Sequence, residues 1–171
     1  MTASYRLQQG VRGLLSRFQR VDDEPARAYL APDAWSLYAR MDKTDRAHCL
    51  RVFGWLQDQD HDDPDLLTAA LLHDSGKSTT SIGIWHRSTK VLLKRLAPDR
   101  WQSLSCPADS GSMRYPYYVL DVHPLLGSRM AAKAGCSKTV VWLIRYHETE
   151  PDKNDPRYPL MRALQDADAV N

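Results

Sequence analysis

The segment from Leu66 to Lys77, LLTAALLHDSGK, starts as an apolar helix and ends in a group of polar side chains. The spacing i, i+3, i+4 and i+7 places four of its residues on one helical face: Leu66, Ala69, Ala70 and His73. Asp74 follows at the expected helix end, and Gly76 is expected to take the left-handed conformation that stops a helix. A buried imidazole beside a carboxylate is costly unless the two are paired or bind a cation. The segment therefore indicates a metal site, provided that the chain supplies further ligands.

Further ligand candidates stand on the expected core faces of other helices: His48, His147 and Asp168. His123 directly precedes Pro124, which predicts a helix from Pro124 to Ala134 with His123 at or near its N-cap. One histidine on such a face is more often an ordinary core residue than a ligand. Four histidines and two aspartates spread over five helices favour a metal site. Asp166 competes with Asp168 but falls on a different helical face from Leu164.

Neutral imidazoles and carboxylates suit borderline divalent metals such as Mn, Fe, Co, Ni and Zn. One metal would take four side chains: His48, His73, Asp74 and Asp168. Because a carboxylate has two oxygens, Asp74 can bridge to a second metal held by His123 and His147. The sequence thus predicts two divalent metal ions.

The order of these residues resembles the HD superfamily of metal-dependent phosphohydrolases. HDSGK matches the HDxGK form of its motif, and His123-Pro124 with Gly127 is similar to the HPxxG element of the HDIG and HD-GYP branches. Tyr146-His147-Glu148 stands where those branches carry HHE, and Ala167-Asp168 with Val170 is similar to ADxL. The GYP signature is absent after Glu148. The resemblance covers the chain from about Asp45 to its end.

The resemblance implies a dinuclear enzyme that cleaves a phosphomonoester, a nucleotide or a phosphodiester with a metal-bridging hydroxide. Asp74 and Lys77 are then the catalytic candidates, and Lys77 would hold a phosphate oxygen. Arg129 and Arg145 are further candidates for substrate binding. A solvated loop lysine is the alternative for Lys77.

Two other functions remain open at this level. Some HD-fold relatives use a pair of iron ions to activate oxygen, and the same six ligands would serve that chemistry. A non-catalytic metal-binding sensor or interaction module is the other alternative.

The length of 171 residues and the absence of convincing period-two alternation outside residues 115–120 predict one all-α domain. We expect an N-terminal helical extension over residues 1–41, with an amphipathic helix from Ser4 to Gln19, packed on an HD-type domain over residues 42–171. Residues 97–114 are expected to form an irregular loop. Trp85, His86 and Arg87 stand just after the motif and are candidates either for substrate contact or for packing.

The net charge and the lengths of the apolar runs limit the classes of partner that we expect this chain to bind. A net charge of +2 gives no strong nucleic-acid signal, and no run is long and apolar enough for a membrane span or a signal peptide. Three cysteines without a CxxC motif are typical of a reducing compartment. We therefore expect a cytoplasmic protein that binds a small phosphorylated substrate, with nucleotide-like molecules among the candidates, and that has no membrane partner. The oligomeric state stays open.

Overall fold

The computed structural model describes residues 21–171, which contain helices and no strand. This confirms the all-α prediction for that part of the chain. The predicted helix from Ser4 to Gln19 lies outside the described residues. In chain order the elements are α2 (Glu24–Tyr29), α3 (Pro32–Ala39), α4 (Lys43–Asp58), α5 (Pro64–Leu72), the short 3-10 helix η1 (Ser75–Thr79), α6 (Ile84–Leu96), α7 (Pro98–Ser105), α8 (Tyr115–Lys133), α9 (Lys138–Tyr146) and α10 (Tyr158–Val170).

Local sequence signals set where several helices begin. The side chain of Asp63 accepts hydrogen bonds from the amides of Asp65 and Leu66, and that of Ser137 accepts one from Val140. Each of these bonds satisfies an amide that has no partner within its own helix. The helices that lead to His73 and His147 therefore both begin at a side-chain cap.

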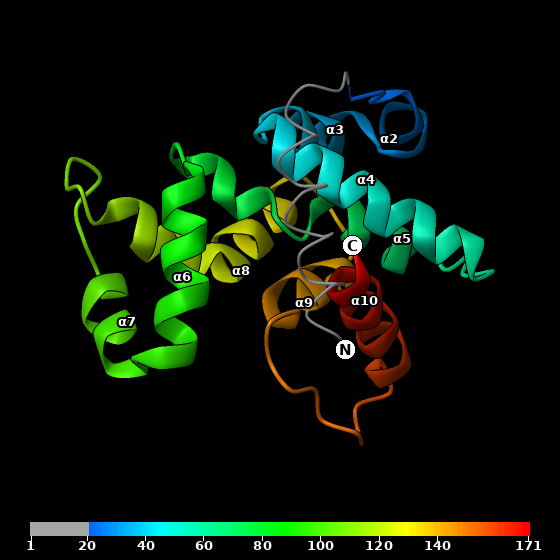
Figure 1. Cartoon of the computed structure of the whole chain (residues 1–171). Coiled ribbons are helices and arrows are strands. Elements are labelled where there is room, and N and C mark those ends of the chain that lie inside the picture. The colour runs from blue at the N-terminus through cyan, green and yellow to red at the C-terminus, as the bar shows by residue number, and fades with distance from the viewer. Residues whose placement is uncertain (1–20) are drawn as a thin grey trace.

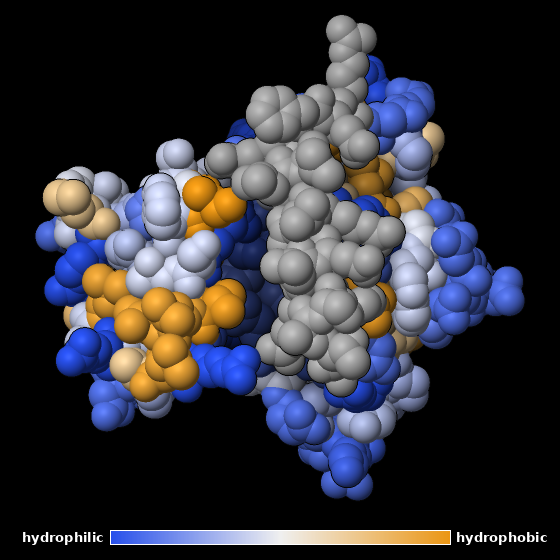
Figure 2. Space-filling model, viewed as in Figure 1, coloured by the Kyte–Doolittle hydropathy of each residue, from blue (hydrophilic) through white to orange (hydrophobic). Residues whose placement is uncertain are grey.

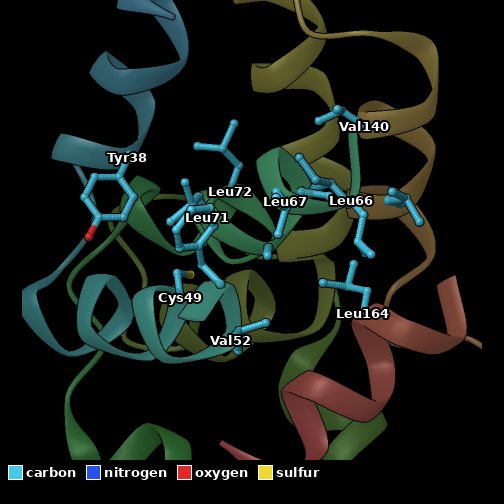
Figure 3. Packing of buried hydrophobic residues seen from close by; sticks show 14 of the residues in the cluster. Tyr38, Cys49, Val52, Leu66, Leu67, Leu71, Leu72, Val140 and Leu164 are labelled. Atoms are coloured by element: carbon cyan, nitrogen blue, oxygen red, sulfur yellow. The ribbon is translucent and has the colours of Figure 1, made fainter. Parts of the chain in front are cut away.

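Helix α5 runs through the middle of the hydrophobic core (Figure 3). Leu66, Leu71 and Leu72 are fully buried there, among side chains from α3, α4, α9 and α10. Buried residues of α2 and α3, such as Ala26 and Tyr38, belong to the same cluster. The core therefore fixes the end of α5, where His73 and Asp74 lie.

Two glycines let η1 and α8 come into backbone contact. A Cβ on Gly76 would lie 2.1 Å from the carbonyl oxygen of His123, and a Cβ on Gly127 would lie 3.1 Å from the amide nitrogen of Gly76. The absence of a side chain at Gly127 therefore permits this close approach. The left-handed conformation expected for Gly76 is wrong, because Gly135 is the described glycine with a positive φ, at 74°. Position 76 requires glycine because a Cβ would not fit there, and not because of its backbone dihedral angles.

Replacing Gly76 by alanine should therefore destabilise the fold. The new methyl group would meet backbone atoms that cannot rotate away, so η1 and α8 must separate, at a cost of about 3 kcal/mol. Chemical denaturation followed by circular dichroism measures the loss. Gly54→Ala is the matched control, since nothing lies within 4 Å of a Cβ there. Because Gly54 lies inside α4, the control should gain roughly 1 kcal/mol. Equal stability of Gly76→Ala and the wild type would contradict the close approach.

Helix α8 is longer than the sequence predicts. It begins at Tyr115 and encloses Pro124, so the expected helix start at Pro124, with His123 near the N-cap, is wrong. A proline inside a helix leaves the carbonyl four residues earlier without its amide donor. Here that carbonyl belongs to Leu120, and it accepts from His123 Nδ1 and Lys90 Nζ, each at 3.1 Å. Side chains thus replace the missing backbone donor.

Residues 97–114 are not the irregular loop that we expected, because α7 occupies Pro98–Ser105. Pro98 stands in the first turn of α7, where a missing amide costs nothing, and Trp101 is buried. Figure 1 shows α6 and α7 together on the left of the molecule, apart from α4, α5 and α10.

Helix α6 has no buried residue and is tied to the rest of the described chain by ion pairs. Arg87 binds Asp45 of α4 through two hydrogen bonds of 2.8 Å, and Lys90 lies 2.7 Å from Glu148. Its apolar side chains point outward and form an exposed patch on the α6 side of the surface (Figure 2): Trp85, Val91, Leu92 and Leu96. The polar face of α6 is therefore the face turned toward the other helices.

No helix within residues 21–171 combines the length and the apolar character that crossing a bilayer requires.

Candidate functional site

Side chains from five segments meet where α5 passes into η1. His73 and Asp74 come from the end of α5, and the other four come from α4, α8, the end of α9 and α10: His48, His123, His147 and Asp168. They form two groups suited to a metal ion, in each of which the ligand atoms lie within 4.8 Å of one another. One group contains His48, His73 and Asp74, and the other contains Asp74, His123 and His147. Asp74 belongs to both.

The first group lies at the partly open side of the cluster. His48 Nε2 is 3.2 Å from His73 Nε2 and 2.8 Å from Asp168 Oδ1. His73 Nε2 is 3.7 Å from Asp168 Oδ1 and also 3.7 Å from Asp74 Oδ2. Asp168 therefore adds a carboxylate to this group, as the sequence predicts.

The second group is buried. His123 Nε2 lies 3.3 Å from Asp74 Oδ1, and the His147 ring packs edge-on against the rings of His73 and His123, with centroids 5.1 and 5.2 Å apart. The two oxygens of Asp74 thus point to different groups, since Oδ2 is the oxygen near His73 and Oδ1 the one near His123. A bridging carboxylate needs this arrangement.

Three of the imidazole rings share one tautomer. Nδ1 of His73, His123 and His147 lies 2.9, 3.1 and 2.9 Å from the backbone carbonyl three residues earlier. A carbonyl only accepts, so each Nδ1 must carry the proton. In the neutral ring Nε2 then has a free lone pair, and each of these lone pairs belongs to the cluster.

Burial and neighbouring charges keep His147 and Asp74 in the protonation states that bind metal ions. Burial, followed by the proximity of His73 and His123, lowers the pKa of His147 to about 3, so its ring is neutral at pH 7. Burial alone would raise the pKa of Asp74, but the Lys77 ammonium at 2.6 Å outweighs it and holds that pKa well below its usual range. Asp74 is therefore an anion and His147 a lone-pair donor.

One direct observation indicates that these residues suit a metal ion. His123 Nε2 is buried and has no hydrogen-bond partner. Because its proton is on Nδ1, it cannot donate to the nearby Asp74 oxygen, so two acceptors face each other. A buried unpartnered acceptor costs about 1–3 kcal/mol, and a cation between the two would remove that cost. The cluster is thus suited to bind metal.

A cavity of about 310 Å³ opens onto this cluster. Its lining adds three cationic side chains: Arg51, Lys77 and Arg87. Thr44, Asp45 and Glu148 line it as well. The cavity therefore has the size and the charged side chains that a small anionic ligand needs.

Sequence reasoning missed Asp45 and Lys90 altogether. Asp45 stands three residues before His48, one turn away on the same side of α4, and this spacing is the signal that could have found it. Lys90 stands three residues after Arg87 on the inward side of α6. The ion pair of Asp45 with Arg87 and that of Lys90 with Glu148 cannot be predicted from sequence spacing, because both depend on where α6 packs.

Other candidates lie elsewhere. Arg129 is exposed on α8, the guanidinium of Arg145 lies 5.9 Å from the Tyr146 ring centroid, and neither is among the described residues lining the cavity. Their contact with substrate stays a prediction. Trp85 is 80% exposed, and His86 accepts the Gly83 amide at the start of α6. Asp166 is exposed and pairs with Arg162 at 2.7 Å, which leaves Asp168 as the carboxylate of α10 in the cluster.

Comparison with known proteins adds no relative: no family model, curated protein or solved structure gives a significant match to the chain. The resemblance to the HD superfamily therefore rests on the motif residues, and membership stays a prediction.

Proposed function

We propose that this protein is a metal-dependent phosphohydrolase of the HD type, acting on a small phosphorylated substrate such as a phosphomonoester, a nucleotide or a phosphodiester. The observation that carries the proposal is the pair of ligand groups that share Asp74, at the base of a cavity with cationic side chains. His48, His73, Asp74 and Asp168 would hold one ion, and Asp74, His123 and His147 a second. Bound divalent ions would supply Lewis acidity and a water molecule of lowered pKa for attack on phosphorus.

The side chains of the protein have distinct tasks in this proposal. The ammonium of Lys77 lines the cavity and would bind a non-bridging phosphate oxygen, offsetting the charge that develops there. Arg87 is held in place by its two hydrogen bonds to Asp45, so its guanidinium keeps a fixed position at the rim. The proton on Nδ1 of His73, His123 and His147 keeps Nε2 aimed at the cluster.

The test is hydrolysis by protein reconstituted with Mn or Co under anaerobic conditions. We expect cleavage of p-nitrophenyl phosphate or its bis ester, because hydrolysis needs a Lewis acid and no change of oxidation state. His48→Ala and Asp168→Ala should lose this activity. Asp166→Ala should retain it, since that carboxylate lies on the same helix but outside the cluster.

Activity only with iron and oxygen would replace the hydrolase by an oxygenase. A metal-replete protein inert in both assays would favour the non-catalytic sensor or interaction module.

A further inference from the structure

Nδ1 of each of the three buried histidine rings donates to a backbone carbonyl, which must therefore be free of a backbone amide donor. The last four carbonyls of a helix have no amide partner within it. Helix α5 ends at Leu72 and α9 ends at Tyr146, so the carbonyls of Ala70 and Ile144, which accept from His73 and His147, lie in last turns. Two of the three rings therefore use a carbonyl that the end of a helix leaves available.

His123 is different because its helix continues. It lies near the middle of α8, ten residues before the last residue, Lys133, so its carbonyl partner Leu120 would ordinarily accept the amide of residue 124. Residue 124 is a proline and has no amide hydrogen. The carbonyl of Leu120 is thereby left for His123 Nδ1 and Lys90 Nζ, each at 3.1 Å.

We infer that Pro124 is a positioning residue for the second metal group: by withholding its amide it reserves the Leu120 carbonyl for the ring of His123, which fixes the proton on Nδ1 and aims Nε2 at Asp74. Pro124 is buried in α8 and contributes no ligand atom of its own. Its effect on the site passes through the carbonyl.

Lys90 takes part in the same arrangement. Its ammonium donates to the Leu120 carbonyl and lies 2.7 Å from Glu148 Oε1, while that oxygen lies 3.8 Å from His123 Nε2. The Leu120 carbonyl oxygen has two lone pairs, and the ring and the ammonium fill both. An amide at residue 124 would be a third donor for two lone pairs, so one donor must give way.

The experiment reads the tautomer directly in metal-free, uniformly ¹⁵N-labelled full-length protein. Long-range ¹H–¹⁵N spectra at pH 8 distinguish Nδ1–H from Nε2–H rings, and a His123→Gln variant assigns the signals. In the wild type we expect His123, His73 and His147 all in the Nδ1–H form. In Pro124→Ala we expect a substantial Nε2–H population at His123 alone, because the other two rings use helix-end carbonyls.

Two variants serve as controls. Pro32→Ala removes a proline from the first turn of α3, where no intrahelical bond is at stake, and should change no histidine signal. Pro124→Val supplies the same amide with a side chain closer in volume to proline. If Pro124→Ala does not fold properly, the tautomer is measured in Pro124→Val instead. Circular dichroism monitors the folding of both variants.

A titration with Zn²⁺ is the second readout. Pro124→Ala should bind one ion about 10-fold or more weakly and the other as the wild type does, which is the size of effect seen for residues that orient metal ligands. An unchanged His123 tautomer in Pro124→Ala and Pro124→Val, or unchanged affinity for both ions, would overturn the inference. The zinc readout rests on the proposed metal site, whereas the tautomer readout needs neither metal nor substrate, so failure of the proposed function is distinguishable from failure of this inference.

Discussion

Asp74→Ala is expected to lose both metal ions and to lower the hydrolytic rate by about 100-fold or more, since changes that merely misorient ligands already cost 10–100-fold. The carboxylate is the one side chain common to both ligand groups, with Oδ2 near His73 and Oδ1 near His123. Without it, the second group keeps only His123 and His147, while the first group keeps His48, His73 and Asp168 but loses the bridging carboxylate and its negative charge. Metal content by elemental analysis and rate with p-nitrophenyl phosphate should fall together.

The control for this prediction is Asp166→Ala, which removes an exposed carboxylate from α10 and should keep full metal content. A second control is thermal unfolding of metal-free Asp74→Ala. It tests whether the variant is folded, because Lys77 would lose its buried partner. A folded Asp74→Ala protein that still binds two ions would contradict the shared carboxylate.

Lys77→Ala should behave differently, with metal content retained and turnover lowered about 100-fold, the usual loss for one group that stabilises developing charge. The Lys77 ammonium lines the cavity and lies 2.6 Å from Asp74 Oδ2. The metal ions can take over the neutralisation of Asp74, but nothing else supplies the ammonium to the substrate from this position in η1. Steady-state kinetics on metal-replete protein gives the effect on turnover.

Lys133→Ala, an exposed lysine at the end of α8, is the matched control and should be indistinguishable from the wild type. If Lys77→Ala loses metal to the same extent as Asp74→Ala, Lys77 orients Asp74 and its assigned contact with the substrate is wrong.

The parts of this fold that sequence predicts well are those decided within one helix. The face that carries His73 continues the apolar stripe of α5, and Asp63 and Ser137 cap their helices through bonds of two or three residues' reach. Such patterns depend on helical geometry and local hydrogen bonds, so spacing reveals them.

The features of the fold and the site that sequence patterns do not predict depend on packing between distant segments. Because proline favours the first turn, the sequence predicts a helix start at Pro124. In the structure Pro124 lies inside α8, where His123 and Lys90 satisfy the carbonyl that it frees. The sequence predicts a helix-ending backbone conformation at Gly76, whereas the actual constraint there is the carbonyl of His123 in α8, which leaves no room for a Cβ. The Arg87–Asp45 pair at the cavity rim likewise joins residues 42 positions apart.

Anomalous scattering from crystals of metal-replete protein tests whether two metal ions share Asp74. We expect two ions, one near His48, His73 and Asp168 and one near His123 and His147, with the Asp74 carboxylate between them. A single ion in fully replete protein, with the rings of His123 and His147 turned away from it, would show that Asp74 does not bridge a metal pair.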